Sequence, residues 1–366
     1  MVTDTYHWLK MKSTSIIVTV IAVLLIGAAY SFFLVAPQKS SVSEFFTLPS
    51  NSPIASLADK LSSEGFIKSS LGFRVVAFLR KEKNIEPGVY QLSKSMNAWK
   101  VSEALQQGPA LKWVTIPEGL RKEQIADIFS ENLGWSEQET RDWITTFSAM
   151  KFDYREGVYF PDTYLIPIHE SPLDVAERLR RHFEEELAPY TLELRSQNIK
   201  WTTALTLASI VQREAAGQED MALIAGILWN RLEKGMQLEV DATVQYARDT
   251  KRNYPDDPCL NTESTEYKEG LCGDEVLLHA KAAYVGGKGW WTPITPEDKR
   301  IVSEYNTYLN KGLPPQPIAN PGIEAIRSVI FPAKTDCLYY LHDGLKNIHC
   351  AKTFSEHLKN IDDYLR

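Results

Sequence analysis

The sequence lacks the residue patterns that mark several common classes of protein. It contains no glycine-rich phosphate-binding loop, no Ser-His-Asp order, and no CxxC or histidine-rich spacing that would indicate a metal site. Basic residues are not in excess either, because 40 lysines and arginines accompany 47 acids and the two signs are interleaved along the chain. The sequence therefore predicts no metal, no other cofactor and no nucleic-acid partner.

Charged side chains are absent from residues 13–38. This stretch supplies the roughly 20 apolar residues that a helix needs to cross a bilayer. A cleaved signal peptide is the alternative, but its apolar region usually spans only about 7–15 residues. We therefore predict a cytoplasmic tail at 1–14 and a retained transmembrane helix at 15–36. Lys10 and Lys12 precede the helix, which favours a single-pass protein with residues 37–366 outside the cytoplasm.

Cysteine is scarce, with four residues in the whole chain. An even number outside the cytoplasm indicates disulfides rather than a metal site. A two-residue turn at 343–344 would place Cys337 directly opposite Cys350 in a hairpin, at the separation that a disulfide needs. We predict that bridge and, by elimination, a second one between Cys259 and Cys272. Free buried thiols are the alternative.

Strand and helix signals do not alternate regularly along the chain, so the predicted fold class is α+β rather than doubly wound. Residues 45–112 form a small module, in which "SPIASLADKLSSEGF" and "AWKVSEALQQG" are expected to be helices and "EPGVYQLSKSM" a turn and strand. Residues 113–366 are helix-rich and end in a β-hairpin and a closing helix. The segment "EGVYFPDTYLIP" is predicted to be an ordered loop because of its prolines, with Tyr159 and Phe160 as a stacking platform or as local core.

One predicted helix carries an acid on its buried side. In "TTALTLASIVQREAA", the side chains of Leu207, Val211 and Glu214 share one arc at 100° per residue. Burial disfavours the charged form of a carboxyl group and raises its pKa, which is what a proton donor near neutral pH requires. An ion pair with Arg213 or Arg231 is the alternative explanation for an inward-facing acid.

Two later segments bear on the role of this acid. Residues 303–322 combine tyrosines, asparagines and four prolines, and such a segment suits a polysaccharide. Tyrosine faces provide flat apolar surface for sugar rings, and asparagine amides provide directional hydrogen bonds for hydroxyl groups. The second segment is "MQLEVDATVQYA", in which Asp241 or Thr243 could contribute to a site or could simply cap the following helix.

The order of several motifs resembles the MltG/YceG-like family of membrane-anchored endolytic murein transglycosylases. These motifs are "SIVQREA", "ILWNRLEKGMQLEVDATVQYA", "YNTYLNKGLPPQPIANPG" and "FSEH", preceded by "IPEG" and "EGVYFPDTY". The resemblance covers nearly all of residues 45–360. It implies that 45–112 is a LysM-like, peptidoglycan-binding module, that 113–366 is the catalytic domain, and that Glu214 is catalytic. The stretch 248–297 does not match the family pattern.

The resemblance also implies a reaction on peptidoglycan glycan strands. The 6-hydroxyl of N-acetylmuramic acid (MurNAc) would attack its own C1 and leave a 1,6-anhydro end, without water. Glu214 would protonate the departing oxygen of N-acetylglucosamine (GlcNAc) and then accept the proton of that hydroxyl. Such cleavage would terminate the elongation of nascent strands beside peptidoglycan synthases. The matching motif positions are expected to bind substrate: Asn230, Asp241, Thr243, Tyr305 and Asn306.

Several alternatives stay open at this point. Asp241 could be a second acid in a muramidase-type hydrolase, and the whole chain could be a non-catalytic, membrane-tethered glycan-binding scaffold. The expected substrate-binding side chains could be structural hydrogen-bonding groups. Glu219 and Asp220 are interpreted as first-turn charges of the next helix, and the histidines near the C-terminus, such as His342, as surface residues.

Overall fold

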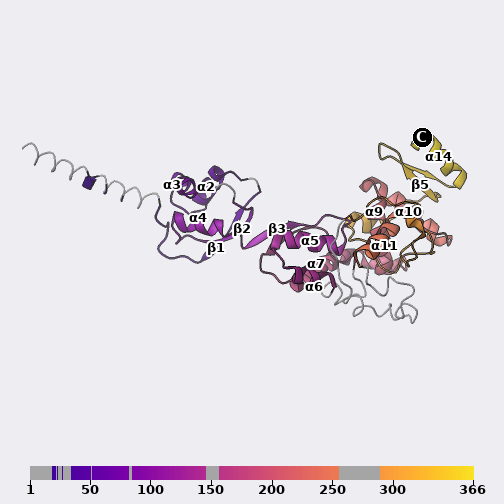
Figure 1. Cartoon of the computed structure of the whole chain (residues 1–366), viewed down its shortest axis with the longest axis horizontal. Coiled ribbons are helices and arrows are strands. Elements are labelled where there is room, and N and C mark those ends of the chain that lie inside the picture. Colours follow the sequence, from indigo (N-terminus) through magenta and orange to yellow (C-terminus); the bar gives the residue numbers. More distant parts are fainter. Residues whose placement is uncertain are drawn as a thin grey trace, which may run out of the picture. The chain divides into compact units, whose positions relative to one another are not determined.

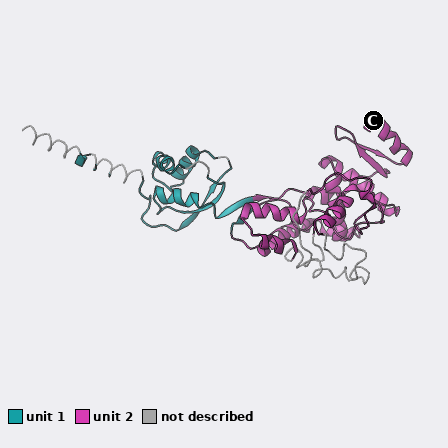
Figure 2. Cartoon of the chain, in the orientation of Figure 1, with its two compact units in different colours: residues 1–113, 165–168 teal, residues 114–164, 169–366 magenta. Residues whose placement is uncertain are grey.

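The computed structural model describes residues 34–50, 52–81, 85–145, 156–254 and 289–366, with a few residues between 19 and 27. Helices dominate the described chain, and the β1–β2, β2–β3 and β5–β6 pairs are antiparallel, which confirms the α+β class (Figure 1). The chain divides into two compact units (Figure 2). Unit 1 comprises Met1–Trp113 with Leu165–Ile168, and unit 2 comprises Val114–Tyr164 with His169–Arg366.

Unit 1 is a small sheet with helices packed on an apolar core. Its elements are β1 (Ser43–Leu48), α2 (Ile54–Ser63), α3 (Ser70–Leu79), β2 (Gly88–Ser93), α4 (Ala98–Gln106) and the start of β3 (Leu111–Thr115). Leu57 and Leu61 recur at helical spacing on α2, and both are buried in one cluster with Phe46 and Leu92 from the two strands. Burial of apolar area on this scale stabilises a fold by roughly 25 cal/mol per Å². A LysM-like character for residues 45–112 stays a prediction.

The sheet contains a strand where a loop was predicted. Its strand order is β1-β2-β3-β4, and β4 (Thr163–Pro167) lies inside the segment that was expected to be an ordered loop. Because β4 is at the edge of the sheet and Pro167 is its last residue, no ladder hydrogen bond is lost to the proline. The same segment is buried, with Tyr159 at 0% and Phe160 at 6% exposure, so these rings are core and not a stacking platform.

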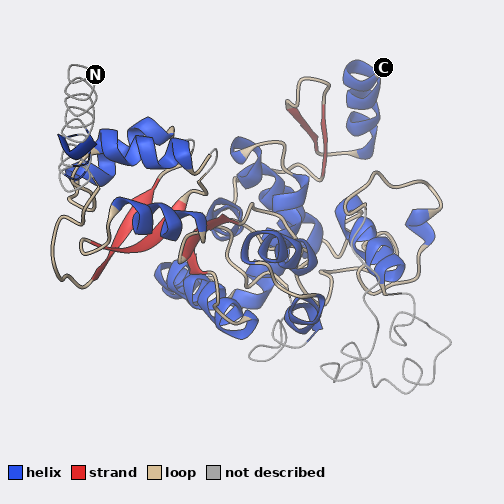
Figure 3. Ribbon diagram, turned by 60° about the vertical axis from the view of Figure 1, so that its left-hand side comes forward, coloured by secondary structure: helices blue, strands red, loops and turns tan. Residues whose placement is uncertain are grey.

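Unit 2 is mainly helical, and its strands near the C-terminus form one hairpin (Figure 3). Its central helix is α9 (Trp201–Glu214), in which every residue from Ala204 to Val211 is buried. Helices α10 (Gln218–Glu233) and α13 (Ile323–Ile330) pack with α9. The other elements are α5 (Lys122–Leu133), α6 (Glu137–Thr145), α7 (Pro172–Leu187), η2 (Ala188–Tyr190), α8 (Thr191–Ser196), α11 (Asp241–Asn253), η6 (Asp298–Arg300), β5 (Tyr339–His342), β6 (Ile348–Ala351) and α14 (Phe354–Leu365).

A glycine allows close packing on α10. A Cβ atom at Gly226 would lie 2.3 Å from the carbonyl oxygen of Ala333, so any side chain there would displace this segment. The backbone N–H of Ala333 donates to the carbonyl of Ala222 at 2.9 Å, one helical turn earlier. The chain that leads from α13 to β5 is therefore held against α10 by its backbone.

The final hairpin confirms one prediction and corrects another. Cys337 and Cys350 form the predicted disulfide, with 5.9 Å between their Cα atoms. They are not directly opposite, however, because Cys350 pairs with Tyr340 across the ladder. The turn is longer than two residues, since the Asp343 side chain accepts hydrogen bonds from the backbone N–H groups of Leu345 (2.8 Å) and Asn347 (2.9 Å). The predicted hairpin and closing helix are both present as β5, β6 and α14.

Several predictions fall wholly or mostly on residues outside the described part. The cytoplasmic tail at 1–14 and most of the transmembrane helix at 15–36 lie there, as do Cys259 and Cys272 and most of the 248–297 stretch. Among the residues that the structure does describe, no helix combines the length and apolar character that crossing a bilayer needs.

Candidate active site

Glu214 is the last residue of α9, where the buried helix meets the surface. The helix ends because Ala215 adopts an extended conformation, with φ −69° and ψ 138°. Glu214 is partly exposed, as are Gln212 and Arg213, whereas Ala204–Val211 earlier in α9 are buried. The residue therefore lies at the edge of the core, with part of its surface accessible to solvent.

Protein groups surround the rest of this carboxyl. The Tyr340 hydroxyl donates a hydrogen bond to Oε2 at 2.7 Å, and the backbone N–H of Ala242 is a second donor. Burial is the largest influence on the carboxyl and raises the pKa of Glu214 above its ordinary range, with a further increase from the negative charge of Asp241. Hydrogen bonds from Tyr340 and Ala242 and the charge of His342 act in the opposite direction. Because the net direction is upward, Glu214 is suited to hold a proton.

The alternative of an ion pair is not what the structure contains. Arg213 lies over the ring of Trp291, 4.1 Å from its centroid, and Arg231 pairs with Glu239 at 2.8 Å. Within the described ranges, no lysine, arginine or histidine nitrogen lies within 4.0 Å of a Glu214 carboxyl oxygen. The inward-facing acid is thus hydrogen-bonded and not neutralised by a guanidinium group.

A second acid lies near Glu214 in a more polar setting. Asp241 is the first residue of α11, preceded by the N-cap residue Val240, and it is exposed. Its Oδ1 accepts a hydrogen bond from the Tyr308 hydroxyl at 2.6 Å and lies 3.5 Å from the Lys299 ammonium group. Asp241 therefore has two stabilising partners, and its charge is one of the causes that raise the pKa of Glu214.

Thr243 and Asn306 hold together the backbone segments that carry Tyr308 and Lys299, the two partners of Asp241. Thr243 is fully buried, donates to the carbonyl of Val240 at 2.7 Å and shares a 2.8 Å hydrogen bond with Thr307. Asn306 is also fully buried, and its side-chain amide donates to the carbonyls of Lys299 and Ile301. These contacts join the segment around 299–308 to the start of α11, beside Asp241.

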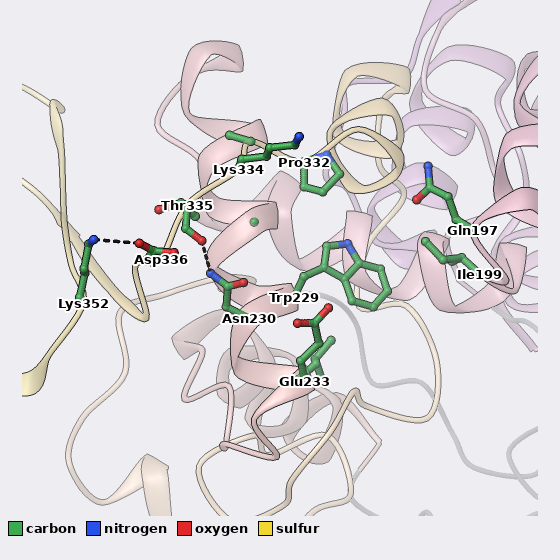
Figure 4. Close-up of a pocket in the computed structure, with 13 residues that line it drawn as sticks. Gln197, Ile199, Trp229, Asn230, Glu233, Pro332, Lys334, Thr335, Asp336 and Lys352 are labelled. Carbon is green, nitrogen blue, oxygen red and sulfur yellow. Dashed lines mark hydrogen bonds and ion pairs between the residues drawn. The ribbon is translucent and has the colours of Figure 1, made fainter.

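The other two expected substrate-binding residues make different contacts. Tyr305 is partly exposed, and its ring centroid is 4.7 Å from that of Tyr246. Asn230 lines a cavity of about 950 Å³ (Figure 4), where its amide nitrogen donates to the carbonyls of Thr335 (2.8 Å) and Cys337 (3.1 Å). Glu214 is not among the residues that line this cavity. The direct roles of all five residues in substrate binding stay predictions.

Three contacts at the site were missed by sequence reasoning. Tyr340 and His342 alternate on β5 and both reach the ends of the helices, His342 through a 3.1 Å contact with Asp220. Tyr308 binds Asp241 from the aromatic segment. The alternation of Tyr340 and His342 was a usable signal, because residues two apart on a strand share one face. The direction of that face depends on how the hairpin docks, which the pattern does not contain.

Acids, histidines and cysteines do not gather into a metal site in the described ranges, where no group of three or more could hold a metal ion. Independently of this, Glu214 and Asp241 provide two neighbouring carboxyl groups, and burial raises the pKa of the first. Such a site can donate a proton to a leaving oxygen and take one back.

Comparison with known proteins identifies the family. The sequence profile of the YceG-like family matches residues 46–363, so the chain belongs to the YceG-like family. It is 26% identical over 368 residues to the endolytic murein transglycosylase of Bacillus subtilis strain 168, covering 93% of this chain and 91% of that protein. It is also 26% identical over 374 residues to the endolytic murein transglycosylase of Streptococcus pneumoniae strain D39, covering 93% of this chain but only 62% of that protein.

A solved structure is similar in fold. The crystal structure of a yceG-like protein from Listeria monocytogenes shares 25% sequence identity with this chain and has a TM-score of 0.53. The match covers 87% of this chain and 99% of that chain. The similarity thus extends across both units.

Proposed function

We propose that this chain is an endolytic peptidoglycan lytic transglycosylase that cleaves the MurNAc-β-1,4-GlcNAc bond. The observation that carries the proposal is Glu214, a partly exposed residue at the end of a buried helix whose carboxyl group has a raised pKa. The relatives named endolytic murein transglycosylase support the choice of substrate.

In the first step, the Glu214 carboxyl donates its proton to the glycosidic oxygen while the bond from that oxygen to C1 of MurNAc breaks. GlcNAc leaves as an alcohol, and Glu214 becomes a carboxylate. In the second step, the 6-hydroxyl of the same MurNAc forms a bond to C1, and its proton passes to Glu214. The nucleophile belongs to the bound sugar, so the protein has mainly to hold the ring and the acid in register.

A muramidase-type hydrolase is the second candidate, favoured by the negative charge of Asp241 beside Glu214. Hydrolysis would use a second carboxylate to direct a water molecule. Asp241 is already engaged by Tyr308 and Lys299, which is compatible with a wall of the substrate site. We favour the transglycosylase because it needs no dedicated second carboxylate.

We further propose that residues 15–36 anchor the chain in the inner (plasma) membrane, with the N-terminus in the cytoplasm and unit 2 in the periplasm. The apolar run supports the anchor, and the Cys337–Cys350 disulfide fits a compartment outside the cytoplasm. In this arrangement residues 45–112 would bind peptidoglycan as a LysM-like module. The enzyme would end the elongation of nascent strands beside peptidoglycan synthases.

Product masses test the reaction directly. The full chain, purified in detergent, is incubated with peptidoglycan, and the fragments are analysed by mass spectrometry. The proposal expects 1,6-anhydro-MurNAc ends, which are lighter than hydrolysis products by one water. Reducing ends would instead support the muramidase. If the chain does not cleave glycan strands, or if a Glu214→Gln variant cleaves them unchanged, the proposal fails and the alternative of a non-catalytic, membrane-tethered scaffold is favoured.

A further inference from the structure

One side chain of the β5–β6 hairpin contacts Glu214 directly. Tyr340 lies on β5 and pairs across the ladder with Cys350, which is itself joined to Cys337 by the disulfide. The backbone at Tyr340 is thus held both by strand pairing and by a covalent link at its partner. Its hydroxyl donates to Oε2 of Glu214 at 2.7 Å.

We infer that Tyr340 is a positioning residue that holds Oε2 of Glu214, so that the transferred proton is carried on the other oxygen and the resulting carboxylate is stabilised. The inference rests on the proposed function and adds a role for a residue outside the helix that carries the acid. Tyr340 does not give up its own proton at any step. The proton of the reaction moves from Glu214 to the glycosidic oxygen and returns from the sugar hydroxyl.

The chemistry of the pair supports this assignment. A hydrogen bond to an ionised oxygen is roughly twice as strong as one between neutral groups, so the Tyr340 bond strengthens when Glu214 loses its proton. Burial and the nearby charge of Glu214 raise the pKa of the Tyr340 hydroxyl well above its usual value. The hydroxyl therefore stays protonated and remains a donor throughout the working pH range.

Other groups around Glu214 and Tyr340 also influence the pKa values of these two side chains. Burial and Asp241 raise the pKa of Glu214, whereas Tyr340, the Ala242 backbone and His342 lower it. Arg231 and Tyr308 act on the Tyr340 hydroxyl itself. Among the described residues, further charged or titratable neighbours are Arg213, adjacent to Glu214 on α9, and Asp220, which contacts His342. Lys299 and Glu239 interact with Tyr308.

Removing the Tyr340 hydroxyl takes away one influence that lowers the pKa of Glu214 and leaves the others in place. The pKa of Glu214 should then rise. Because Glu214 must be protonated to start the reaction, the rate falls as pH increases through this pKa. The high-pH limb of the rate profile should therefore move to higher pH when the hydroxyl is absent.

The test is Tyr340→Phe in the full chain, with Tyr339→Phe as the matched control. Tyr339 is the preceding residue on β5, and its ring stacks on His357 with centroids 5.5 Å apart. Strand cleavage is measured from pH 4 to pH 9. Tyr340→Phe is expected to lower kcat about 10- to 100-fold and to shift the high-pH limb upward by about one pH unit. Tyr339→Phe should leave both unchanged, and the melting temperatures of the two variants should match.

The inference would be overturned if Tyr340→Phe had the same kcat as Tyr339→Phe and the same high-pH limb in its rate profile. So would a lower rate with an unmoved limb and a lower melting temperature, because that result describes a purely structural role. Neither outcome affects the proposed function. Unchanged cleavage by the Glu214→Gln variant would remove the acid itself from the mechanism, and both proposals would then fall together.

Discussion

Glu156 and Glu214, both in unit 2, have carboxyl groups whose pKa values are raised chiefly by desolvation, yet the two residues differ in exposure to solvent. Glu156 is 1% exposed, and burial raises its pKa to about 8, assisted by the charge of Glu123. Glu214 is partly exposed and its pKa is also raised. A perturbed pKa therefore does not identify an active site by itself. The exposure of the residue to solvent separates the two acids.

The neighbours of the two acids differ as well. Glu156 accepts hydrogen bonds from the Lys122 backbone N–H at 2.9 Å and from the Asn320 amide at 2.5 Å. Arg121 and Glu123, each 1% exposed, form a salt bridge beside it at 3.1 Å. These contacts join segments distant in the sequence, which is a structural task. Glu214 instead accepts a hydrogen bond from a tyrosine on a disulfide-bonded hairpin, and the residue is partly exposed.

The largest expected difference between the two acids is in their effect on strand cleavage. Glu214→Gln is expected to reduce strand cleavage by about 10²- to 10⁴-fold, because general acid–base catalysis contributes that much. Glu156→Gln should stay within about threefold of the unchanged enzyme, since glutamine resembles the protonated form that Glu156 holds at pH 7. Equal losses in the two variants would show that access does not distinguish the acids.

The next largest effect concerns the buried salt bridge. Arg121→Met should lower the free energy of unfolding by about 3–5 kcal/mol, because Glu123 would keep a buried charge without its partner. Arg327→Met is the control, since the Arg327–Glu324 pair is exposed and such pairs contribute at most about 1 kcal/mol. Urea unfolding measures both. A similar small change in the two variants would contradict the structural role of the cluster.

The third largest effect is expected on removal of the Cys337–Cys350 disulfide. Replacing both Cys337 and Cys350 by serine should reduce the stability of the hairpin by about 3 kcal/mol, because the bridge closes a short loop in the unfolded chain. Hydrogen exchange at the β5 and β6 amides measures this local change. Cleavage should also slow, since Tyr340 would be less well fixed. Unaltered exchange together with full activity would mean that strand pairing alone suffices.

Glu156 also predicts a dependence of stability on pH. In the unfolded chain it ionises near its ordinary pKa of about 4.3, whereas in the folded chain it keeps its proton up to about pH 8. The folded state thus binds more protons in this window, and stability should fall as pH rises from about 5 to 8, by up to about 1.4 kcal/mol per unit. Urea midpoints at pH 5 and pH 8 should differ less in Glu156→Gln. Parallel curves for the two proteins would be inconsistent with a raised pKa.

The smallest effect is expected at Asn230. Asn230→Ala removes the donor for two carbonyls and should cost about 1–2 kcal/mol of stability. Because this amide nitrogen is already engaged by the protein, KM for glycan strands should change little. A large rise in KM with unchanged stability would instead place Asn230 among the groups that contact sugar.

Much of the architecture could be predicted from local patterns. Helix α4 follows its apolar spacing and its Asn97 cap, and the Cys337–Cys350 disulfide follows from two cysteines flanking a turn. The errors arose where a side chain altered the backbone locally. Asp343 lengthens the turn and shifts the register, and Pro167, which a central strand would not tolerate, ends an edge strand.

The sequence alone determined that Glu214 lies beside an apolar helix face, because residues at helical spacing share one side whatever surrounds them. Only the tertiary structure decided its partners. Tyr340 follows Glu214 by 126 residues, and Tyr308 follows Asp241 by 67. Local periodicity specifies which face of an element is buried, but not which distant element packs on it. The donor to the acid, the partner of the second carboxylate and the open side of the site all depend on that packing.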